Sequence, residues 1–381
     1  MAPSIYAAQT AADLEALSAG QGGLRVLAQL EAQERDNPAS RWSYRHLIAY
    51  RLLTRPETPI LEAFKDHEDQ CPVCRPNEPC SQKLDYAKTQ ALEEDACLKQ
   101  LAWRPESEIM RLPDGFFWNA LAQLGRNGPT YVNYSTAVDG SSFPIPASSP
   151  SEFELSAENL EKHEELRIKP DDATVHLVKC FLQYALNLCL LQDSENTGKE
   201  VRLRPDRRMG KARIAGVEGI SAEDDGGICL VTRQLFEWEA THPYLAVLEA
   251  KRAFQYLHYN TRNGNTKPIV SNETLAQYLG EAVITWKANW RLINQDVFLI
   301  AASHTYLRIV HFHFGSDYEE CIDATSEDAQ RALVDNPTKD TCVRMQATEW
   351  CNIATVSGRQ AALCNILALL RWHKAQGVQI P

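Results

Sequence analysis

The sequence lacks several features that define large classes of protein. No stretch approaches the ~20 continuous apolar residues that a membrane-spanning helix needs. The first ten residues do not join a basic segment to an apolar one, so we expect no secretory signal peptide. No segment recurs at a fixed interval, which argues against a repeat architecture. These absences predict an intracellular protein, nuclear or cytoplasmic, with no membrane partner.

An excess of positive charge is also absent. The 381 residues carry 39 Lys and Arg against 50 Asp and Glu, a net charge of −11. An acidic surface is poor for non-specific attraction to nucleic acid, which argues against a protein that simply coats DNA. The net negative charge is still compatible with an enzyme that has a local cluster of basic residues. With 44% hydrophobic residues, the chain can bury one large or two moderate cores.

Eleven cysteines without a signal peptide indicate reduced thiols or a metal site, because disulfide frameworks belong to oxidising compartments. Cys71 and Cys74 have the spacing that lets two sulfurs bind one tetrahedral Zn²⁺. His67 and Cys80 flank them as further ligands, with Cys97 as an alternative to one of these. Unligated cysteines in a loop remain the competing interpretation.

The most informative stretch runs from Asp225 to Lys251. The apolar run Tyr244–Leu248 has strand-like content and ends in Glu249-Ala250-Lys251. Side chains alternate faces along a strand, so Glu249 and Lys251 point the same way, about 7 Å apart. Asp225 precedes another apolar run upstream. A charge at the end of a buried strand is costly unless it is used or paired, which favours a functional site over a cross-strand salt bridge.

These residue types suit metal-assisted phosphodiester hydrolysis. Mg²⁺ prefers oxygen ligands and is often held by one or two carboxylates together with a substrate phosphate. Asp225 and Glu249 are the candidate carboxylates, and the backbone carbonyl of Ala250 is a candidate third ligand. Lys251 is placed to orient the attacking water or to neutralise the charge of the transition state. Mn²⁺ is the alternative ion.

Asp225-Gly-Gly-Ile followed by Leu248-Glu249-Ala250-Lys251 resembles the core motif of the PD-(D/E)xK, or restriction-endonuclease-like, nuclease superfamily. The chain is similar to uncharacterised nuclease-like proteins of filamentous fungi over about residues 170–320. The resemblance implies an α/β fold in which a mixed central sheet is flanked by helices in the order αβββαβ. It also implies a hydrolase that cleaves DNA, or else RNA. Gln277 matches a glutamine that helps to position the site in one branch of the superfamily.

Two departures from the family pattern leave a second interpretation open. Asp224 stands where the superfamily has proline, and the Pro205-Asp206 pair lies 43 residues before Glu249. The expected first helix has no acidic residue between Asp172 and Asp193, although many family members have one. The alternative is therefore a catalytically inactive nuclease fold that binds nucleic acid or a protein partner, a second copy of the chain included.

A basic track precedes the expected sheet. Lys199–Arg213 holds seven basic residues against two acidic ones. Lysine and arginine gathered on one face can contact phosphates, each releasing about one counterion. The candidate nucleic-acid contacts are Arg204, Arg207, Arg208 and Lys211. The competing interpretation is a solvated loop that offsets the acidic stretch 218–225.

The pattern of apolar residues divides the chain into three parts. Residues 1–140 form a mainly helical region, residues 141–155 are linker-like, and residues 156–381 form the nuclease-like domain. In the first part the expected helices are 43–53, 83–103 and 116–124. In the last part we expect helices 173–192, 272–288 and 358–376, and strands near 212–221, 227–233, 244–250, 296–302, 305–314 and 343–353.

Overall fold

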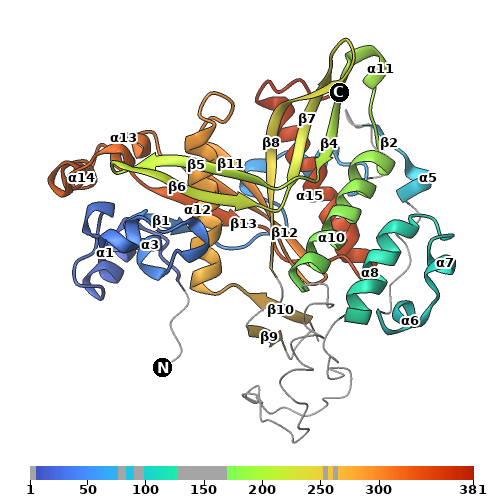
Figure 1. The fold of residues 1–381 in the computed structure, drawn as a ribbon, viewed down its shortest axis with the longest axis horizontal. Helices are drawn as coiled ribbons and strands as arrows, with labels where there is room; N and C mark the ends of the chain where they lie inside the picture. The colour runs from blue at the N-terminus through green and yellow to red at the C-terminus, as the bar shows by residue number, and fades with distance from the viewer. Residues whose placement is uncertain (1–5, 76–82, 90–97, 128–169, 252–255, 261–264) are drawn as a thin grey trace, which may run out of the picture.

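The computed structural model describes residues 6–75, 83–89, 98–127, 170–251, 256–260 and 265–381. Its fold is mixed α/β, with a central eight-stranded sheet flanked by helices (Figure 1). The strands of this sheet are β1 (Leu52–Thr54), β4 (Lys199–Arg204), β7 (Gly227–Arg233), β8 (Trp238–Lys251), β11 (Asp296–Ser303), β12 (Tyr306–Phe314), β13 (Val343–Ala347) and β14 (Cys351–Asn352).

The order of strands across the sheet is β1-β13-β12-β11-β8-β7-β4, and β14 pairs with β12. Strands β4, β7 and β8 are antiparallel neighbours, whereas β11 runs parallel to β8. Such a parallel pair needs a crossover connection, which here includes a long helix. In the parallel register, Glu249 lies opposite Ala301 and Lys251 lies opposite Ser303.

Three two-stranded sheets lie outside the central one. They are β2 (Lys83–Leu84) with β3 (Leu190–Leu191), β5 (Arg208–Ile214) with β6 (Val217–Asp224), and β9 (Tyr256–Asn260) with β10 (Asn265–Ile269). The helices are α1 (Ala11–Ala19), α2 (Ala32–Arg35), α3 (Tyr44–Ala49), α4 (His67–Gln70), α5 (Tyr86–Thr89), α6 (Leu98–Trp103), α7 (Glu106–Ile109), α8 (Gly115–Asn127), α10 (Pro170–Gln183), α11 (Ser194–Thr197), α12 (Asn272–Ala288), α13 (Tyr318–Asp323), α14 (Glu327–Val334) and α15 (Val356–Ala375).

The two faces of the central sheet bury two different hydrophobic cores. Successive side chains of a strand point to opposite faces. Leu248 and Ala250 of β8 therefore join the core formed with α8, α10 and α15. Val247 joins the core formed with α12 and with the N-terminal residues. Glu249 has the same parity as Val247, so the strand presents its carboxylate to α12.

The N-terminal region takes part in the central sheet. Strand β1 pairs in parallel with β13, with Leu52 opposite Val343. Helix α8 packs against α10 on the opposite side of the molecule (Figure 1). The expected linker 141–155 lies outside the described residues.

Several expected elements are confirmed, because their apolar periodicity is long and unbroken. Helix α12 has the expected bounds, and so does β7. Strands β11 and β12 each lie within one residue of the expected limits. Helix α15 begins two residues early and ends one residue early.

The expected strand 212–221 is wrong. The chain reverses at Ala215 and Gly216, whose φ angles are 49° and 80°, so this segment forms the β5–β6 hairpin. The preceding strand of the sheet is instead β4, which covers the first part of the expected basic track. Alternation of charged and apolar residues in Lys199–Arg204 was the signal for this strand.

Other expected boundaries are also corrected. The helix expected over 173–192 ends at Gln183, continues as a π-helical segment over Tyr184–Cys189, and gives way to β3. The helix expected over 43–53 ends at Ala49, and Leu52 begins a strand. Short apolar runs do not distinguish a strand from a buried helix, which explains both errors.

Two further expected elements are each divided in two. The helix expected over 83–103 becomes α5 and α6, between which residues 90–97 are not described. The strand expected over 343–353 becomes β13 and β14.

Among the described residues, no helix combines the length and the apolar character that crossing a bilayer requires.

Gly227 allows the close approach of β7 and β8. A Cβ atom at this position would lie 2.2 Å from the carbonyl oxygen of Ala246, on the neighbouring strand. We expect Gly227→Ala to lower the free energy of unfolding by about 1–3 kcal/mol, because the strands must separate. Urea unfolding followed by circular dichroism measures this change.

Gly20→Ala is the matched control, since Gly20 has helical φ and ψ angles and its added Cβ would lie 3.4 Å from the nearest atom. Equal stability of the two variants would contradict the close-packing argument.

Candidate functional site

Asp225 and Glu249 are brought together where β7 begins and β8 ends. Asp225 lies in the short connection between β6 and β7, and its amide donates to the carbonyl of Leu248 at 2.8 Å. The amide of Ala250 donates to Oδ2 of Asp225 at 3.0 Å. The Asp225 carboxylate therefore lies against the backbone that carries Glu249. The end of β8 thus places both acidic residues at the same site.

The side chain of Gln277, on α12, also lies at this site. Its amide nitrogen donates to Glu249 at 2.7 Å and to Glu281 at 2.8 Å. Glu249 is 3% exposed and Glu281 is 1% exposed, so two carboxylates are buried beside one amide group. Glu281 was not expected at this site, although it follows Gln277 by one helical turn and therefore shares its face.

These residues line a cleft of about 330 Å³. Its walls come from the β5–β6 hairpin, α12, the end of β8 and the segment 38–40. The N-terminal segment can approach α12 because Gly280 has no side chain, and a Cβ there would lie 2.6 Å from that of Ala39. The lining side chains that can act chemically are Arg207, Ser221, Glu223, Asp225, Glu249, Gln277 and Glu281.

Lys251 is the last residue of β8, and its side chain lies outside the described part of the structure. A different lysine lies near Asp225. Lys179 of α10 donates to the carbonyl of Pro205 at 2.7 Å. Burial lowers the pKa of Lys179, and the negative charge of Asp225 opposes this effect. Lys179 lies on the expected first helix of the nuclease-like fold, where many members of the superfamily have an acidic residue. This position was a signal that the sequence analysis missed.

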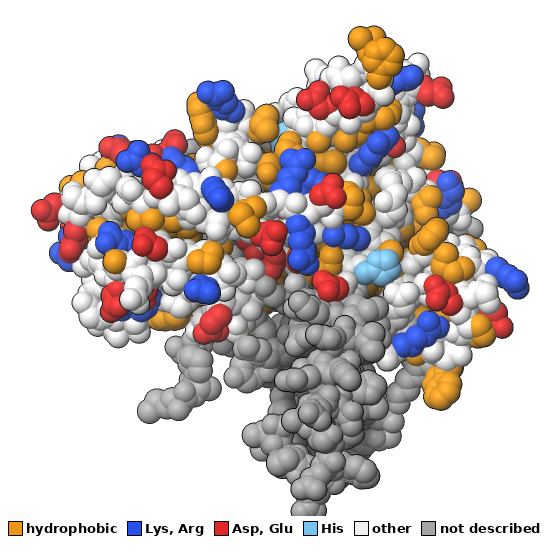
Figure 2. Space-filling view, viewed as in Figure 1, with side chains coloured by type: hydrophobic (Ala, Val, Ile, Leu, Met, Phe, Trp, Pro, Cys, Tyr) orange, Lys and Arg blue, Asp and Glu red, His pale blue; other side chains and the backbone are white. Residues whose placement is uncertain are grey.

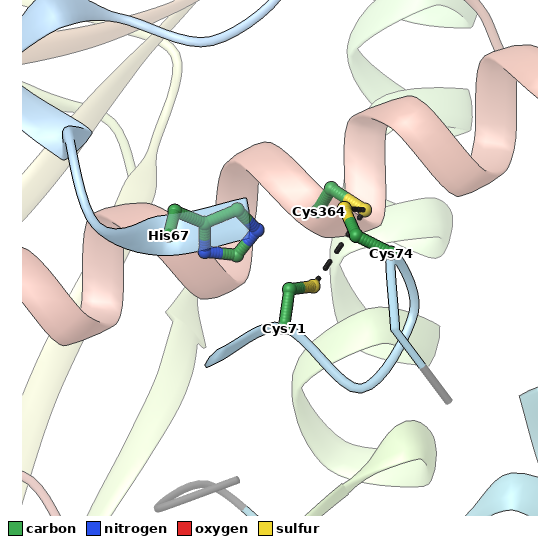
Figure 3. Close-up of side chains that lie close together, drawn as sticks. All are labelled: His67, Cys71, Cys74 and Cys364. Atoms are coloured by element: carbon green, nitrogen blue, oxygen red, sulfur yellow. Dashed lines mark hydrogen bonds between the residues drawn. The ribbon is translucent and has the colours of Figure 1, made fainter. Parts of the chain in front are cut away.

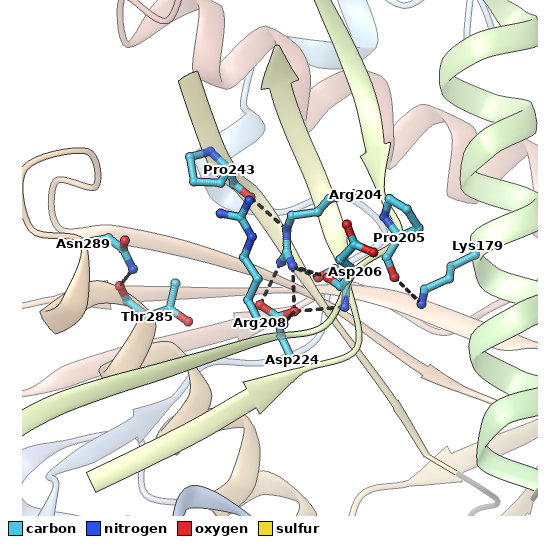
Figure 4. Close-up of polar contacts among 10 residues, drawn as sticks. Lys179, Arg204, Pro205, Asp206, Arg208, Asp224, Pro243, Thr285 and Asn289 are labelled. Carbon is cyan, nitrogen blue, oxygen red and sulfur yellow. Dashed lines mark hydrogen bonds and ion pairs between the residues drawn. The ribbon is translucent and has the colours of Figure 1, made fainter. Parts of the chain in front are cut away.

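Asp224 and Arg204 form a buried ion pair beside the cleft (Figure 4). The Arg204 guanidinium donates to the two carboxylate oxygens of Asp224 at 2.9 and 2.8 Å. The amides of Arg208 and Gly226 donate to the same carboxylate. Burial raises the pKa of Asp224, and Arg204 opposes this shift. Asp224 is thus a structural residue, and its neighbour Asp225 is the one that faces the cleft.

The expected basic track is therefore wrong in part. The Arg204 side chain is only 4% exposed and fully engaged, so it is not available to a phosphate. Arg208 is half-buried, with its guanidinium 6.0 Å from the Tyr244 ring centre. Lys211 is exposed and lines a separate cavity that also contains Lys287. Lysine and arginine side chains alternate with acidic ones over the face shown in Figure 2.

Arg207 is the one member of this set that enters the cleft. It pairs with Asp225 at 3.1 Å and reaches Asp172 of α10 at 3.5 Å. Its side chain is 48% exposed, so it can exchange these partners for others at low cost.

A second group of side chains, none of which lines the cleft, lies close together (Figure 3). His67 of α4 and the two cysteines that follow it meet Cys364 of α15, with all four ligand atoms within 4.8 Å of one another. The sulfur of Cys364 lies 3.8 Å from that of Cys71 and 3.2 Å from that of Cys74. These residues could hold a metal ion.

A fourth candidate ligand comes from a distant part of the chain. The expected ligand Cys80 lies outside the described residues, and Cys364, 290 residues beyond Cys74, lies beside the two other thiols. Spacing along the sequence could not have revealed it, because Cys364 lies in an apolar helix pattern where cysteine usually behaves as a small hydrophobe.

We expect Asp224→Asn to destabilise the protein by about 3–5 kcal/mol, because it leaves the Arg204 charge buried without its counter-ion. Chemical denaturation measures the loss. Asp172→Asn is the matched control, since it removes a carboxylate from an exposed arginine and should cost about 1 kcal/mol or less. If the two variants lost the same free energy of unfolding, the buried ion pair would contribute no more to stability than the exposed one.

No protein-family model matches this chain, and no curated protein matches it either.

Proposed function

We propose that the protein is a metal-dependent nuclease that hydrolyses phosphodiester bonds of DNA, with RNA as the second candidate. The observation that carries the proposal is the shared cleft of Asp225, Glu249 and Gln277. The carboxylates of Asp225, just before β7, and of Glu249, on β8, are the oxygen ligands that Mg²⁺ or Mn²⁺ prefers, and the open cleft leaves room for a phosphate.

The order of elements supports the resemblance to restriction-endonuclease-like nucleases. Helix α10 is followed by the antiparallel strands β4, β7 and β8, then by α12, and then by β11 parallel to β8. The β5–β6 hairpin is an insertion between the first two of these strands. If β3, α11 and the β9–β10 pair are also set aside as insertions, the remaining elements are consistent with the αβββαβ order that the resemblance implies. Asp225 then lies just before the second strand and Glu249 near the end of the third.

The donor set fits a hard divalent cation. Asp225 and Glu249 would hold it, with the Ala250 carbonyl as a further oxygen ligand beside them. The bound ion would supply charge stabilisation and an activated water. Gln277 would keep the Glu249 carboxylate oriented, since its amide already donates to it. Lys251 would orient the attacking water, and Arg207 would turn from Asp225 to the substrate phosphate.

A second function is supported by the Arg207–Asp225 ion pair itself. In this arrangement an arginine already neutralises one of the two metal-binding carboxylates. The same fold could therefore bind nucleic acid, or a protein partner, without cleaving anything. Divalent-metal binding distinguishes the two proposals, because only the nuclease requires it.

We expect the wild-type chain to cleave linear, circular or single-stranded DNA in Mg²⁺ or Mn²⁺. Glu249→Gln should lower the cleavage rate at least about 100-fold and weaken metal binding, because a charged ligand is lost. Lys251→Ala should retain the metal and lose cleavage, because the amine acts on the water and is no ligand. Gel assays and calorimetric titration with Mn²⁺ measure the two effects.

Glu218→Gln provides the matched control, because Glu218 pairs with Arg213 on the exposed hairpin, away from the cleft. Unchanged cleavage and metal binding in Glu249→Gln would refute the nuclease. A wild-type chain that binds DNA, binds no divalent metal and cleaves no DNA would establish the inactive alternative.

We further propose that the cluster of His67, Cys71, Cys74 and Cys364 binds a structural Zn²⁺. Tetrahedral zinc with Zn–S bonds of about 2.3 Å places its sulfurs about 3.8 Å apart. The Cys71–Cys364 separation of 3.8 Å matches this value, and the 3.2 Å contact of Cys74 needs a small opening. Nε2 of His67 is buried and makes no hydrogen bond within the described residues.

Arg371 contacts both the backbone and the ring of His67. It donates to the carbonyl of His67 at 3.2 Å, and it lies 3.3 Å from Nδ1 of the ring. An imidazole bound to zinc through Nε2 carries its proton on Nδ1. Arg371 would therefore give up the ring contact on metal binding and keep its carbonyl partners.

The purified chain should contain one Zn²⁺ at this cluster by elemental analysis, and chelation should lower its melting temperature. Cys364→Ser should lose this zinc, whereas Cys180→Ser, which changes a thiol outside the cluster, should keep it. Cys80→Ser separates the two ligand assignments. Loss of zinc in Cys80→Ser but not in Cys364→Ser would contradict the role of Cys364.

A further inference from the structure

Two histidines and an aspartate meet on the central sheet, away from both sites described above. His311 and His313 are two residues apart on β12, so their side chains share one face. Asp296 of β11 lies directly opposite His313 in the antiparallel register. Nε2 of His311 and Nδ1 of His313 donate to the same carboxylate oxygen, at 2.7 and 2.8 Å.

The three side chains have the geometry of a metal-ligand set. Their ligand atoms all lie within 4.8 Å of one another. Around a tetrahedral ion with bonds of about 2.0–2.1 Å, neighbouring ligand atoms are about 3.3 Å apart. The carboxylate would therefore need to move back by about half an ångström, which a side-chain rotation allows. The backbone of two paired strands keeps the three residues in register.

The surroundings keep the ligands oriented. The ring of His311 stacks on Phe298 with a centroid distance of 4.7 Å. Arg344 lies opposite His313 on β13, and Asp340 offsets its charge through contacts of 2.7 and 3.1 Å.

The site is open on one side. The side-chain exposure rises from 13% for His311 to 20% for Asp296 and 40% for His313. A metal held here would keep coordination positions for water or for a small anionic ligand. In the cysteine cluster, by contrast, four protein ligands would complete a tetrahedral shell.

We propose that Asp296, His311 and His313 form a binding site for a divalent transition-metal ion with open coordination positions. Two imidazoles and one carboxylate suit Zn²⁺, Ni²⁺, Co²⁺ or Fe²⁺ better than Mg²⁺, which takes oxygen ligands alone. This site is independent of the nuclease proposal, because none of its residues lines the cleft of Asp225.

The test is calorimetric titration of the full chain with Ni²⁺ in a buffer that contains excess Mg²⁺, which competes for the carboxylates of the cleft. Cys364→Ser, measured in parallel, removes a ligand of the cysteine cluster and should still bind Ni²⁺ at Asp296, His311 and His313. The wild type should bind one Ni²⁺. His313→Ala and Asp296→Asn should each weaken this binding at least about tenfold, since even residues that only support a ligand have effects of about that size.

His176→Ala is the matched control, because His176 is an exposed histidine of α10 that belongs to neither cluster. It should bind Ni²⁺ as the wild type does. The His313 side chain is 40% exposed, and its removal also costs the hydrogen bond to Asp296, so the melting temperature of each metal-free variant is measured alongside. A wild type that binds no Ni²⁺ would overturn the proposal. Equal binding in His313→Ala, Asp296→Asn and the wild type would overturn it as well.

Discussion

The buried contact between Arg204 and Asp224 determines how the strands around the cleft are joined. Arg204 ends β4 and Asp224 ends β6, so their ion pair fastens the inserted hairpin to the central sheet. The same carboxylate accepts hydrogen bonds from two backbone amides, one of which belongs to Gly226. The direction of Asp225 follows from this arrangement, because it is held between two anchored residues. Breaking a buried pair of this kind costs about 3–5 kcal/mol.

Around that anchor the protein concentrates negative charge in a partly buried cleft. Glu249 and Glu281 are almost completely buried and share the amide of Gln277, while Arg207 neutralises Asp225 from the more exposed side. Buried carboxylates are tolerated when they are hydrogen-bonded or when they bind a cation. A cleft built in this way favours a cationic ligand, and this preference connects the nuclease proposal with the inactive alternative: in one the cation is a metal ion, and in the other it is Arg207.

The two candidate metal-binding clusters connect other parts of the fold. The cysteine cluster joins α4 and the segment after it to α15, and its members Cys74 and Cys364 are 290 residues apart. A bond between such distant segments restricts the unfolded chain strongly, because the loop that it closes is long. The cluster on β11 and β12 restricts little, since those strands are already paired along their length. A structural role thus suits the first cluster, and ligand binding suits the second.

Local patterns in the sequence determined much of the framework. The 17 residues of α12 and the apolar runs of β7, β11 and β12 follow from hydrophobic periodicity, which depends only on neighbours in the chain. The Glu249-Ala250-Lys251 motif and the Cys71–Cys74 pair were recognisable for the same reason. Tertiary structure alone decided that Arg204 is buried, that Cys364 completes the cysteine cluster and that Asp296 meets two histidines. Cys364 is 290 residues from Cys74, where spacing carries no information. Arg204 and Asp224 are 20 residues apart, and Asp296 is 15 and 17 residues from the two histidines, but the register of the paired strands decides that these side chains meet.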